Sequence, residues 1–290
     1  MFIWSQLGIK FTVNREFTEI GRKLLIPLNE HFRGNYLKPI CDVIIQKDSD
    51  IDAAAINIMR CQNCIIFCKT EFLPHLCSEL AGNVKSHVLI THNSDFHIDE
   101  KKYGLKPPCI KTWFARNTEI ERPDLIPIPI GIENEGEGCS GDAEFMSHIR
   151  VAKLPPRNLV YLNVNTRTNP KEREPCVEIL KDKPFVVYQP NRISFHEYCS
   201  EASSCIFVAS PPGNGMDCYR TWEALFMGLI PIVKRNSNME SFSNTRMLII
   251  DDWNELNSLM LLGFKDKAYS DDETKLSYWI ERIKDAYNRL

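Results

Sequence analysis

The sequence predicts an α/β protein with two parallel sheets, and three observations lead to this prediction. Short runs rich in Val, Ile, Phe and Cys recur along the chain, and most of them break into polar residues at the carboxyl end. Helix-compatible stretches separate several of these runs. Short continuous apolar runs are typical of strands that a parallel sheet buries on both faces. The length of 290 residues suits two compact domains, which implies a cleft between them.

The first half of the chain predicts one such sheet. Its expected strands are residues 41–46, 64–68, 87–91 and 112–115. Helices expected at 51–60 and 73–82 lie between the first three strands, as in βαβ units. Open α/β sheets bind ligands beyond the carboxyl ends of their strands. We therefore expect the polar segments KTEF, HNSD and RN, which follow the strands, to line one edge that faces the cleft.

A domain boundary is predicted near residue 150. The glycine- and acid-rich segment EGEGCSGD follows PIPIGIEN (127–134), and LPPRN (154–158) contains prolines that resist helix formation. We therefore divide the chain into an N-terminal α/β domain, 1–153, and a C-terminal α/β domain, 154–290.

The second half predicts another α/β sheet. Its expected strands are residues 159–164, 184–189, 204–210, 229–234 and 247–251. The last twenty residues, 271–290, place apolar side chains at spacings of three and four, with acids in the first turn. This pattern predicts an amphipathic helix, which we assign to the C-terminal domain.

Composition excludes several classes of function. A formal net charge of −3 and an isoelectric point near 6.2 give no general attraction to nucleic acid or to an anionic membrane. The N-terminal segment MFIWSQLGIKFTVNREF lacks a long apolar run, so we expect neither a secretory signal nor a membrane anchor. The expected location is the cytoplasm.

The cysteines predict reduced thiols. The chain has eleven, an odd number, and most lie in apolar runs. This distribution favours buried free thiols in a reducing compartment over a disulfide framework. Cys61, Cys64 and Cys68 form a cluster, but no second pair with metal-ligand spacing follows it, so we expect no metal site there.

The segment 210–233, SPPGNGMDCYRTWEALFMGLIPIV, is the most informative part of the sequence. Gly213 and Gly215 follow an expected strand and precede a helix that we expect to begin near Asp217 and to end at Gly228. Backbone N–H groups and the positive end of a helix dipole make such a loop an anion site. Cys218 stands where the dinucleotide fingerprint requires its third glycine, and the chain has no Walker A motif.

Three polar residues are expected on one face of this helix, because Asp217, Arg220 and Glu223 are three residues apart. Arg220 can pair with a diphosphate through its planar guanidinium, and Glu223 can accept hydrogen bonds from both hydroxyls of a ribose. The alternative is an internal Arg220–Glu223 pair with Asp217 as the helix N-cap.

The basic segment 163–173, NVNTRTNPKER, offers further anion contacts. It follows the first strand of the second half and carries Arg167, Lys171 and Arg173, which can pair with phosphates or remain solvated. Asn169 and Pro170 suit the start of a helix, whereas Pro175 favours a kink or a later start. Tyr188 ends a later strand, where it can hold a base or belong to an ordinary loop.

The pattern DxYRxWEALxxGxIPIV, which Asp217, Tyr219, Arg220, 222–225 and 228–233 supply, resembles the nucleotide-sugar segment of the exostosin-like glycosyltransferases. The segments THNSD, WFARN, IPIPIGIEN and NTRTNPKER resemble those of short exostosin-like enzymes of bacteria and large DNA viruses. In length and in lacking an anchor, the chain is similar to the virus-encoded β-xylosyltransferases of this family. The resemblance covers roughly residues 85–250.

The resemblance implies a GT-B fold, in which two Rossmann-like domains face each other across a cleft. It also implies a UDP-sugar donor, UDP-xylose as the best single guess, a glycan acceptor, and inversion at the anomeric carbon without a bound metal or prosthetic group. A virus-encoded enzyme would act in the host cytoplasm. The donor contacts that we expect are Asn165, Arg167, Lys171, Arg173, Tyr188, Ser210, Gly213, Asn214, Gly215, Asp217, Tyr219, Arg220 and Glu223.

Transfer with inversion needs a general base on the acceptor side. Asp95, Glu71 and His92 lie at the expected strand ends of the first half. A carboxylate is favoured because it is ionised at neutral pH, although the pKa of a histidine is tunable near 7. Each residue has an alternative role, since Asp95 and His92 can cap a turn and Glu71 can begin a helix.

Two rival functions remain open. The run DSDID (48–52) contains the DxD pattern with which GT-A transferases hold a metal, and Asp48 and Asp50 would be its ligands. The same acids also suit the start of the helix that follows, with Asp50 or Asp52 as the N-cap. The chain can also be a glycan- or nucleotide-sugar-binding protein without catalytic turnover.

Overall fold

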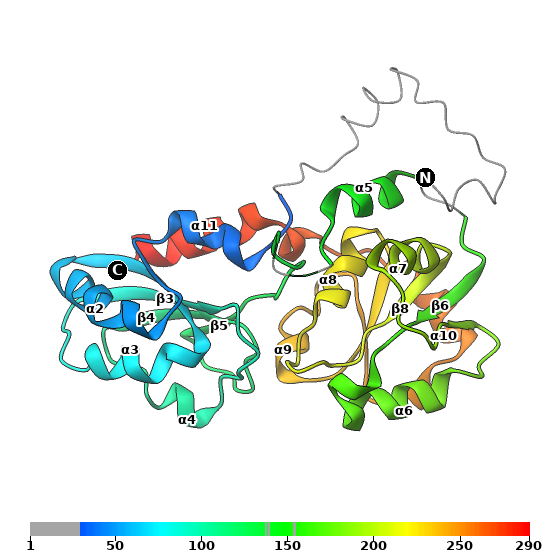
Figure 1. Ribbon diagram of the computed structural model, residues 1–290, viewed down its shortest axis with the longest axis horizontal. Coiled ribbons are helices and arrows are strands. Elements are labelled where there is room, and N and C mark those ends of the chain that lie inside the picture. The colour runs from blue at the N-terminus through cyan, green and yellow to red at the C-terminus, as the bar shows by residue number, and fades with distance from the viewer. Residues whose placement is uncertain (1–29, 137, 139, 153–154) are drawn as a thin grey trace, which may run out of the picture.

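The computed structural model describes residues 30–136, 138, 140–152 and 155–290. The N-terminal segment for which the sequence predicts no signal and no anchor lies outside the described residues. The described chain forms an α/β structure with two separate five-stranded sheets (Figure 1). Neighbouring strands are parallel throughout both sheets, so the prediction of an α/β protein with two parallel sheets is confirmed.

The first sheet runs in chain order, β1-β2-β3-β4-β5. Its strands are β1 (Val43–Ile45), β2 (Asn63–Lys69), β3 (Ser86–His92), β4 (Ile110–Ala115) and β5 (Leu125–Pro127). The crossover helices are α2 (Ile51–Arg60), α3 (Leu73–Glu79) and α4 (Glu100–Tyr103). The four predicted strands are confirmed, and β5 is an addition.

Alternate residues of the first sheet belong to two different cores, as the period of a strand requires. Cys64, Ile66 and Cys68 of β2 pack with α2 and α3. Ile65 and Phe67 point to the opposite face, into a core that also contains Trp279 and Ile283 of the last helix. The apolar run of β2 is therefore continuous because both of its faces are covered.

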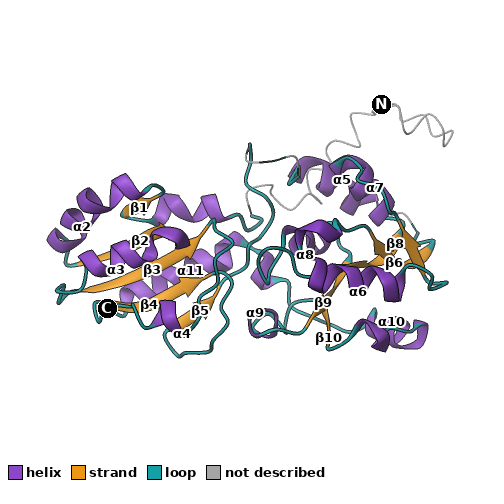
Figure 2. Cartoon of the chain, turned by 60° about the horizontal axis from the view of Figure 1, so that its bottom comes forward, coloured by secondary structure: helices purple, strands orange, loops and turns teal. Residues whose placement is uncertain are grey.

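The amphipathic helix predicted at the end of the chain is α11 (Leu276–Asn288). It contacts β2 and β3, on the face of the first sheet opposite to α2 and α3 (Figure 2). The predicted division at residues 153 and 154 stays a prediction, but this helix, which we assigned to the C-terminal domain, lies on the first sheet.

The second sheet has the order β10-β9-β8-β6-β7. Its strands are β6 (Asn158–Leu162), β7 (Val186–Tyr188), β8 (Cys205–Ala209), β9 (Ile230–Lys234) and β10 (Leu248–Ile250). Its helices are α5 (Ala143–Ala152), α6 (Pro170–Leu180), α7 (Phe195–Ala202), α8 (Tyr219–Phe226), α9 (Ser237–Glu240) and α10 (Ser258–Phe264). All five predicted strands are confirmed.

Short 3₁₀ turns complete the described chain: η2 (Gly34–Ile40), η3 (Asp48–Asp50), η4 (Thr70–Phe72), η5 (Thr166–Thr168), η6 (Trp253–Glu255) and η7 (Asp272–Thr274). The later start that Pro175 suggested for α6 is wrong, because the helix begins at Pro170 and continues through Pro175. Pro170 is at the first helical position, where the missing N–H removes no hydrogen bond.

At strand β6, the second sheet changes the side on which successive strands are added. The chain passes from β6 to β7 on one side and then returns to β8 on the other side of β6. The loops that leave β6 and β8 consequently diverge at the carboxyl ends of the strands. Such a switch point is where open α/β sheets bind their ligands.

The ten cysteines of the described residues are free thiols, and seven of them are buried. Cys64 and Cys68 lie in β2 as the sequence predicts. Within the same described part, no helix has the length and apolar character needed to cross a membrane.

Candidate functional site

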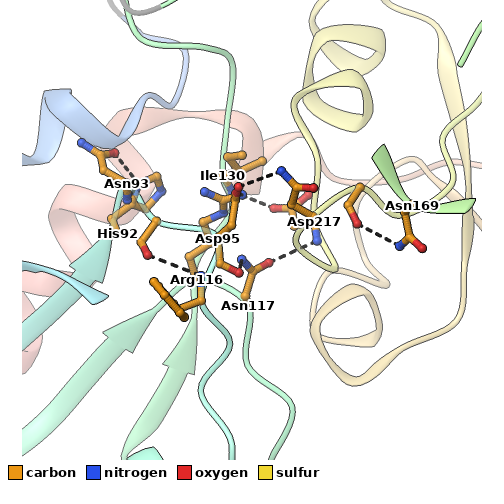
Figure 3. A network of polar contacts seen from close by, with 12 residues as sticks. His92, Asn93, Asp95, Arg116, Asn117, Ile130, Asn169 and Asp217 are labelled. Atoms are coloured by element: carbon orange, nitrogen blue, oxygen red, sulfur yellow. Dashed lines mark hydrogen bonds and ion pairs between the residues drawn. The ribbon is translucent and has the colours of Figure 1, made fainter. Parts of the chain in front are cut away.

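The loops at the carboxyl ends of the two sheets meet, and the polar residues predicted to be functional concentrate there. Asn117, just after β4, accepts a hydrogen bond from the N–H of Asp217 at 3.2 Å. The N–H of Ile130 donates to the Asp217 carboxylate at 2.7 Å. Figure 3 shows Asp95, Arg116 and Asn117 on the side of the first sheet and Asp217 facing them.

The glycine loop, residues 211–218, joins β8 to α8, and its glycines are required for close approach. A Cβ atom on Gly215 would lie 2.6 Å from the side-chain amide of Asn117. A Cβ atom on Gly213 would lie 2.9 Å from the Arg173 guanidinium. Any larger residue at these two positions would displace either the loop or the side chain of Asn117 or Arg173.

The side chain of Arg173, on α6, holds the glycine loop through hydrogen bonds. Its side chain is buried and donates to the carbonyls of Pro212 at 2.9 Å and of Asn165 at 3.0 Å. Asn169 donates to the carbonyl of Gly213 at 2.9 Å. Burial lowers the pKa of Arg173, and the nearby charge of Arg220 lowers it further. Arg173 therefore fixes the loop and places a positive charge beside Arg220.

Arg220 and Glu223 lie on α8, and each has a buried polar atom without a hydrogen-bond partner among the described residues. The atoms are Nε of Arg220 and Oε1 of Glu223. The side chain of Glu223 is only 4% exposed. Burial raises the pKa of Glu223 to about 7, although the charge of Arg220 opposes the shift. Buried unpaired polar atoms are costly and call for an explanation, and a bound ligand is one.

The alternative internal pairing of these two residues does not form: no ion pair joins Arg220 to Glu223 in the part of the chain that the structure describes. The Arg220 guanidinium instead lies 5.9 Å from the centre of the Tyr198 ring. A cation over an aromatic face keeps its hydrogen-bonding edge available.

The structure places Asp217 outside the helix on which the sequence predicted it. It precedes α8, whose N-cap is Cys218, so it is neither on the helical stripe nor the cap. Its buried carboxylate accepts from the Trp222 indole N–H at 2.7 Å as well as from Ile130. Burial raises the pKa of Asp217 to about 6, and these hydrogen bonds oppose the shift. Asp217 therefore fastens the glycine loop to the first sheet.

The remaining predicted donor residues belong to the second sheet and its helices, at or after the carboxyl ends of the strands. Ser210 is buried and lies 2.9 Å from the Thr221 hydroxyl, and Tyr219 is the first residue of α8. Arg167 is exposed in η5, which Asn165 caps, and Lys171 is exposed at the start of α6. Tyr188 ends β7, half-buried.

Asp95 is exposed and lies at the junction of the two sheets. One carboxylate oxygen pairs with Arg116 at 3.2 Å, and the other accepts from the side-chain amide of Asn214 at 3.1 Å. The residue first in line as the general base is thus in contact with the glycine loop.

Glu71 and His92 are more enclosed. Burial by itself would raise the pKa of Glu71, but hydrogen bonds from its own backbone N–H, from Ser94 and from Lys69 outweigh it and hold the pKa below its ordinary value. His92 is buried, and its Nε2 lies 2.9 Å from the carbonyl oxygen of Pro129. An Nε2–H that donates to this carbonyl leaves only Nδ1 to take a proton, and the backbone N–H of Asn93 donates to that nitrogen at 2.8 Å.

Neither protein-family models nor curated proteins yield a match to this sequence. The resemblance to exostosin-like glycosyltransferases accordingly stays an interpretation of the motif residues.

Two residues of the site have roles that the sequence did not reveal. Arg116 is buried and pairs with Asp95, and Asn117 has a left-handed backbone with φ of 56°. Asparagine tolerates this conformation better than other side chains, which places its amide against the glycine loop. The only available signal was the polar RN pair directly after a strand.

The acidic run 48–52 lies at the start of α2. Asp50 is at the N-cap position and Asp52 is in the first turn, as the helix-start interpretation predicts, although the Asp50 side chain accepts no capping hydrogen bond from α2. The Asp50 carboxylate accepts from the backbone N–H of Lys47 at 3.0 Å, and Asp48 pairs with His75 at 3.1 Å. Over the described ranges, no group of three potential ligands lies close enough to hold a metal ion.

Proposed function

We propose that this protein is a glycosyltransferase of the GT-B type, which moves a sugar from a UDP-sugar donor to a hydroxyl group of a glycan. In this proposal the second sheet binds the donor and the first sheet binds the acceptor. The meeting of the two carboxyl edges at Asn117 and Asp217 supports the arrangement, because it brings two ligand-binding edges together.

The pair of unsatisfied groups on α8 carries the proposal. Glu223 presents a buried carboxylate oxygen without a partner in the described chain, and Arg220 presents a buried Nε in the same condition. A ribose supplies two adjacent hydroxyl donors for the carboxylate, and a diphosphate supplies acceptor oxygens for the guanidinium. A single nucleoside diphosphate would therefore supply hydrogen-bond partners to both residues.

The donor diphosphate would lie over the glycine loop. The positive end of α8, the guanidinium of Arg220 and the charge of the buried Arg173 all act on this place. Arg167 and Lys171 would add exposed positive charge at its rim. With these cations at the leaving group, the proposed reaction uses no metal ion or prosthetic group.

The reaction would be a single displacement. The carboxylate of Asp95, or of Glu71 as the alternative, removes the proton from the acceptor hydroxyl as its oxygen attacks the anomeric carbon. The bond from that carbon to the diphosphate oxygen breaks, and UDP leaves with the electron pair. One displacement inverts the configuration. UDP-xylose is the donor we propose.

A thermal-unfolding screen of nucleoside diphosphates and nucleotide sugars tests this function. A ligand present at 100 times its dissociation constant adds about 2.7 kcal/mol to the free energy of unfolding. We expect UDP and UDP-xylose to raise the melting temperature and GDP and ADP to raise it less. Donor hydrolysis and transfer are then measured with the hit. Binding of UDP with neither activity would favour a nucleotide-sugar-binding protein.

A further inference from the structure

Phe96 is the only exposed Phe, Tyr or Trp among the described residues. Its side chain is 55% exposed, and the other residues of these three types are buried or half-buried. Burial of a Phe side chain contributes about 1.5–3 kcal/mol. The fold therefore forgoes a favourable contact at this position and leaves the aromatic ring accessible to a ligand.

The backbone around Phe96 is fixed. Ile98 forms a bridge with Thr118, its N–H donates to the Asn117 carbonyl at 2.9 Å, and its carbonyl accepts from the Glu119 N–H at the same distance. Lys102 of α4 lies with its ammonium 5.8 Å from the centre of the Phe96 ring. The exposed ring is thus presented by an ordered segment, so a ligand that binds it pays little to order the loop.

In the chain, Phe96 is next to the residue proposed as the general base. It follows Asp95 directly, and Asp95 contacts both Arg116 of the first sheet and Asn214 of the glycine loop. The residues on either side of Phe96 in the chain are polar: Asp95 precedes it, and His97, which follows it, pairs with Glu119. An exposed aromatic ring in a segment that also carries carboxylates suits a ligand that has C–H groups on one face and hydroxyls around its edge.

We propose that Phe96 is the platform on which the acceptor sugar stacks. A pyranose ring carries axial C–H groups that are polarised by the ring oxygens, and the negative face of an aromatic ring attracts them. Its equatorial hydroxyls would then reach the polar rim, with one of them at Asp95. This inference rests on the proposed function, because that function places the acceptor on the first sheet. It names the acceptor class: a glycan that ends in a pyranose with an apolar face.

Saturation-transfer NMR tests the platform without knowledge of the full acceptor. The probe is a mixture of the methyl pyranosides of glucose, galactose, mannose, xylose and fucose, added to the protein in saturating UDP. We expect transfer to axial ring protons of at least one glycoside, with affinity at least about tenfold weaker in Phe96→Ala. Phe96→Tyr keeps an aromatic face and should retain binding. Leu105→Ala, an exposed apolar residue just beyond α4, is the matched control and should change nothing.

Two results would overturn the proposal: no transfer to any glycoside in the wild-type protein, or equal transfer in the wild type and Phe96→Ala. Calorimetry of UDP on the same samples separates this inference from the proposed function. Normal UDP affinity with Phe96-independent glycoside binding refutes the platform alone. Absent UDP affinity with Phe96-dependent glycoside binding refutes the transferase and leaves a glycan-binding surface.

Discussion

The two edges that meet in this molecule differ in how their polar groups are satisfied. On the second sheet, Arg220 and Glu223 are enclosed and keep buried atoms without partners in the described chain. On the first sheet, Asp95 is exposed and both of its oxygens already have partners. Under the proposed function, the site on α8 is built in advance for its ligand, whereas the groups of the opposite edge would have to exchange partners when an acceptor binds.

The largest expected effect is on the exposed edge. Asp95→Asn should reduce turnover by about 10² to 10⁴-fold while donor affinity stays almost unchanged, because asparagine keeps the shape but takes no proton at neutral pH. Steady-state kinetics at saturating donor and acceptor provide the measurement.

Glu71→Gln is the internal control for this prediction. Near-normal turnover in Asp95→Asn together with an inactive Glu71→Gln would assign the base to Glu71 and leave Asp95 as a bridge between Arg116 and Asn214.

The next largest effect is expected for Arg220 and Glu223, the buried pair on α8. Arg220→Ala and Glu223→Gln should each weaken UDP binding by about 1.5–3 kcal/mol, since each removes a charged hydrogen-bond partner. Calorimetry measures the loss, and circular dichroism checks the fold. Lys171→Ala, at an exposed position on α6, should change UDP affinity much less. Equal losses in all three variants would mean that burial does not distinguish the donor site.

A smaller effect follows from the pKa of Glu223, which is raised to about 7. A carboxyl whose pKa is higher in the folded protein binds more protons there than in the unfolded chain, so the free energy of unfolding falls as pH rises from about 4.5 to 7. Without ligand, Glu223→Gln should lose part of this decline and gain stability relative to wild type at pH 8. Urea unfolding at pH 5 and pH 8 tests it. Asp217 shares the direction of the shift, so only the difference between the two proteins is informative.

The smallest expected effect is that of chelation. Transfer should proceed in EDTA, and Asp48→Asn combined with Asp50→Asn should leave turnover within about twofold, because these acids are engaged at the start of α2. Activity that EDTA removes and manganese restores would favour the metal-dependent GT-A alternative instead.

Local sequence patterns predicted the strands well because most of the strands are buried on both faces and therefore read as apolar runs. Strand β5 was missed because it has only three residues, ends at Pro127 and is followed closely by Pro129. The glycine loop and the placement of Arg220 and Glu223 were predictable from residue spacing. The position of Asp217 was not, because its partners, Ile130 and Asn117, are distant in the chain. The partner of α11 was equally hidden, since an amphipathic pattern does not say which sheet a helix covers.

The course of α11 has a consequence for synthesis on the ribosome. The core that contains Phe67 of β2 is completed by Trp279 and Ile283, more than two hundred positions later in the chain. The first sheet therefore has to wait, with one apolar face unprotected, while the whole second sheet emerges and collapses. Chaperones that bind exposed apolar surface have their longest opportunity on the half of the molecule that is translated first.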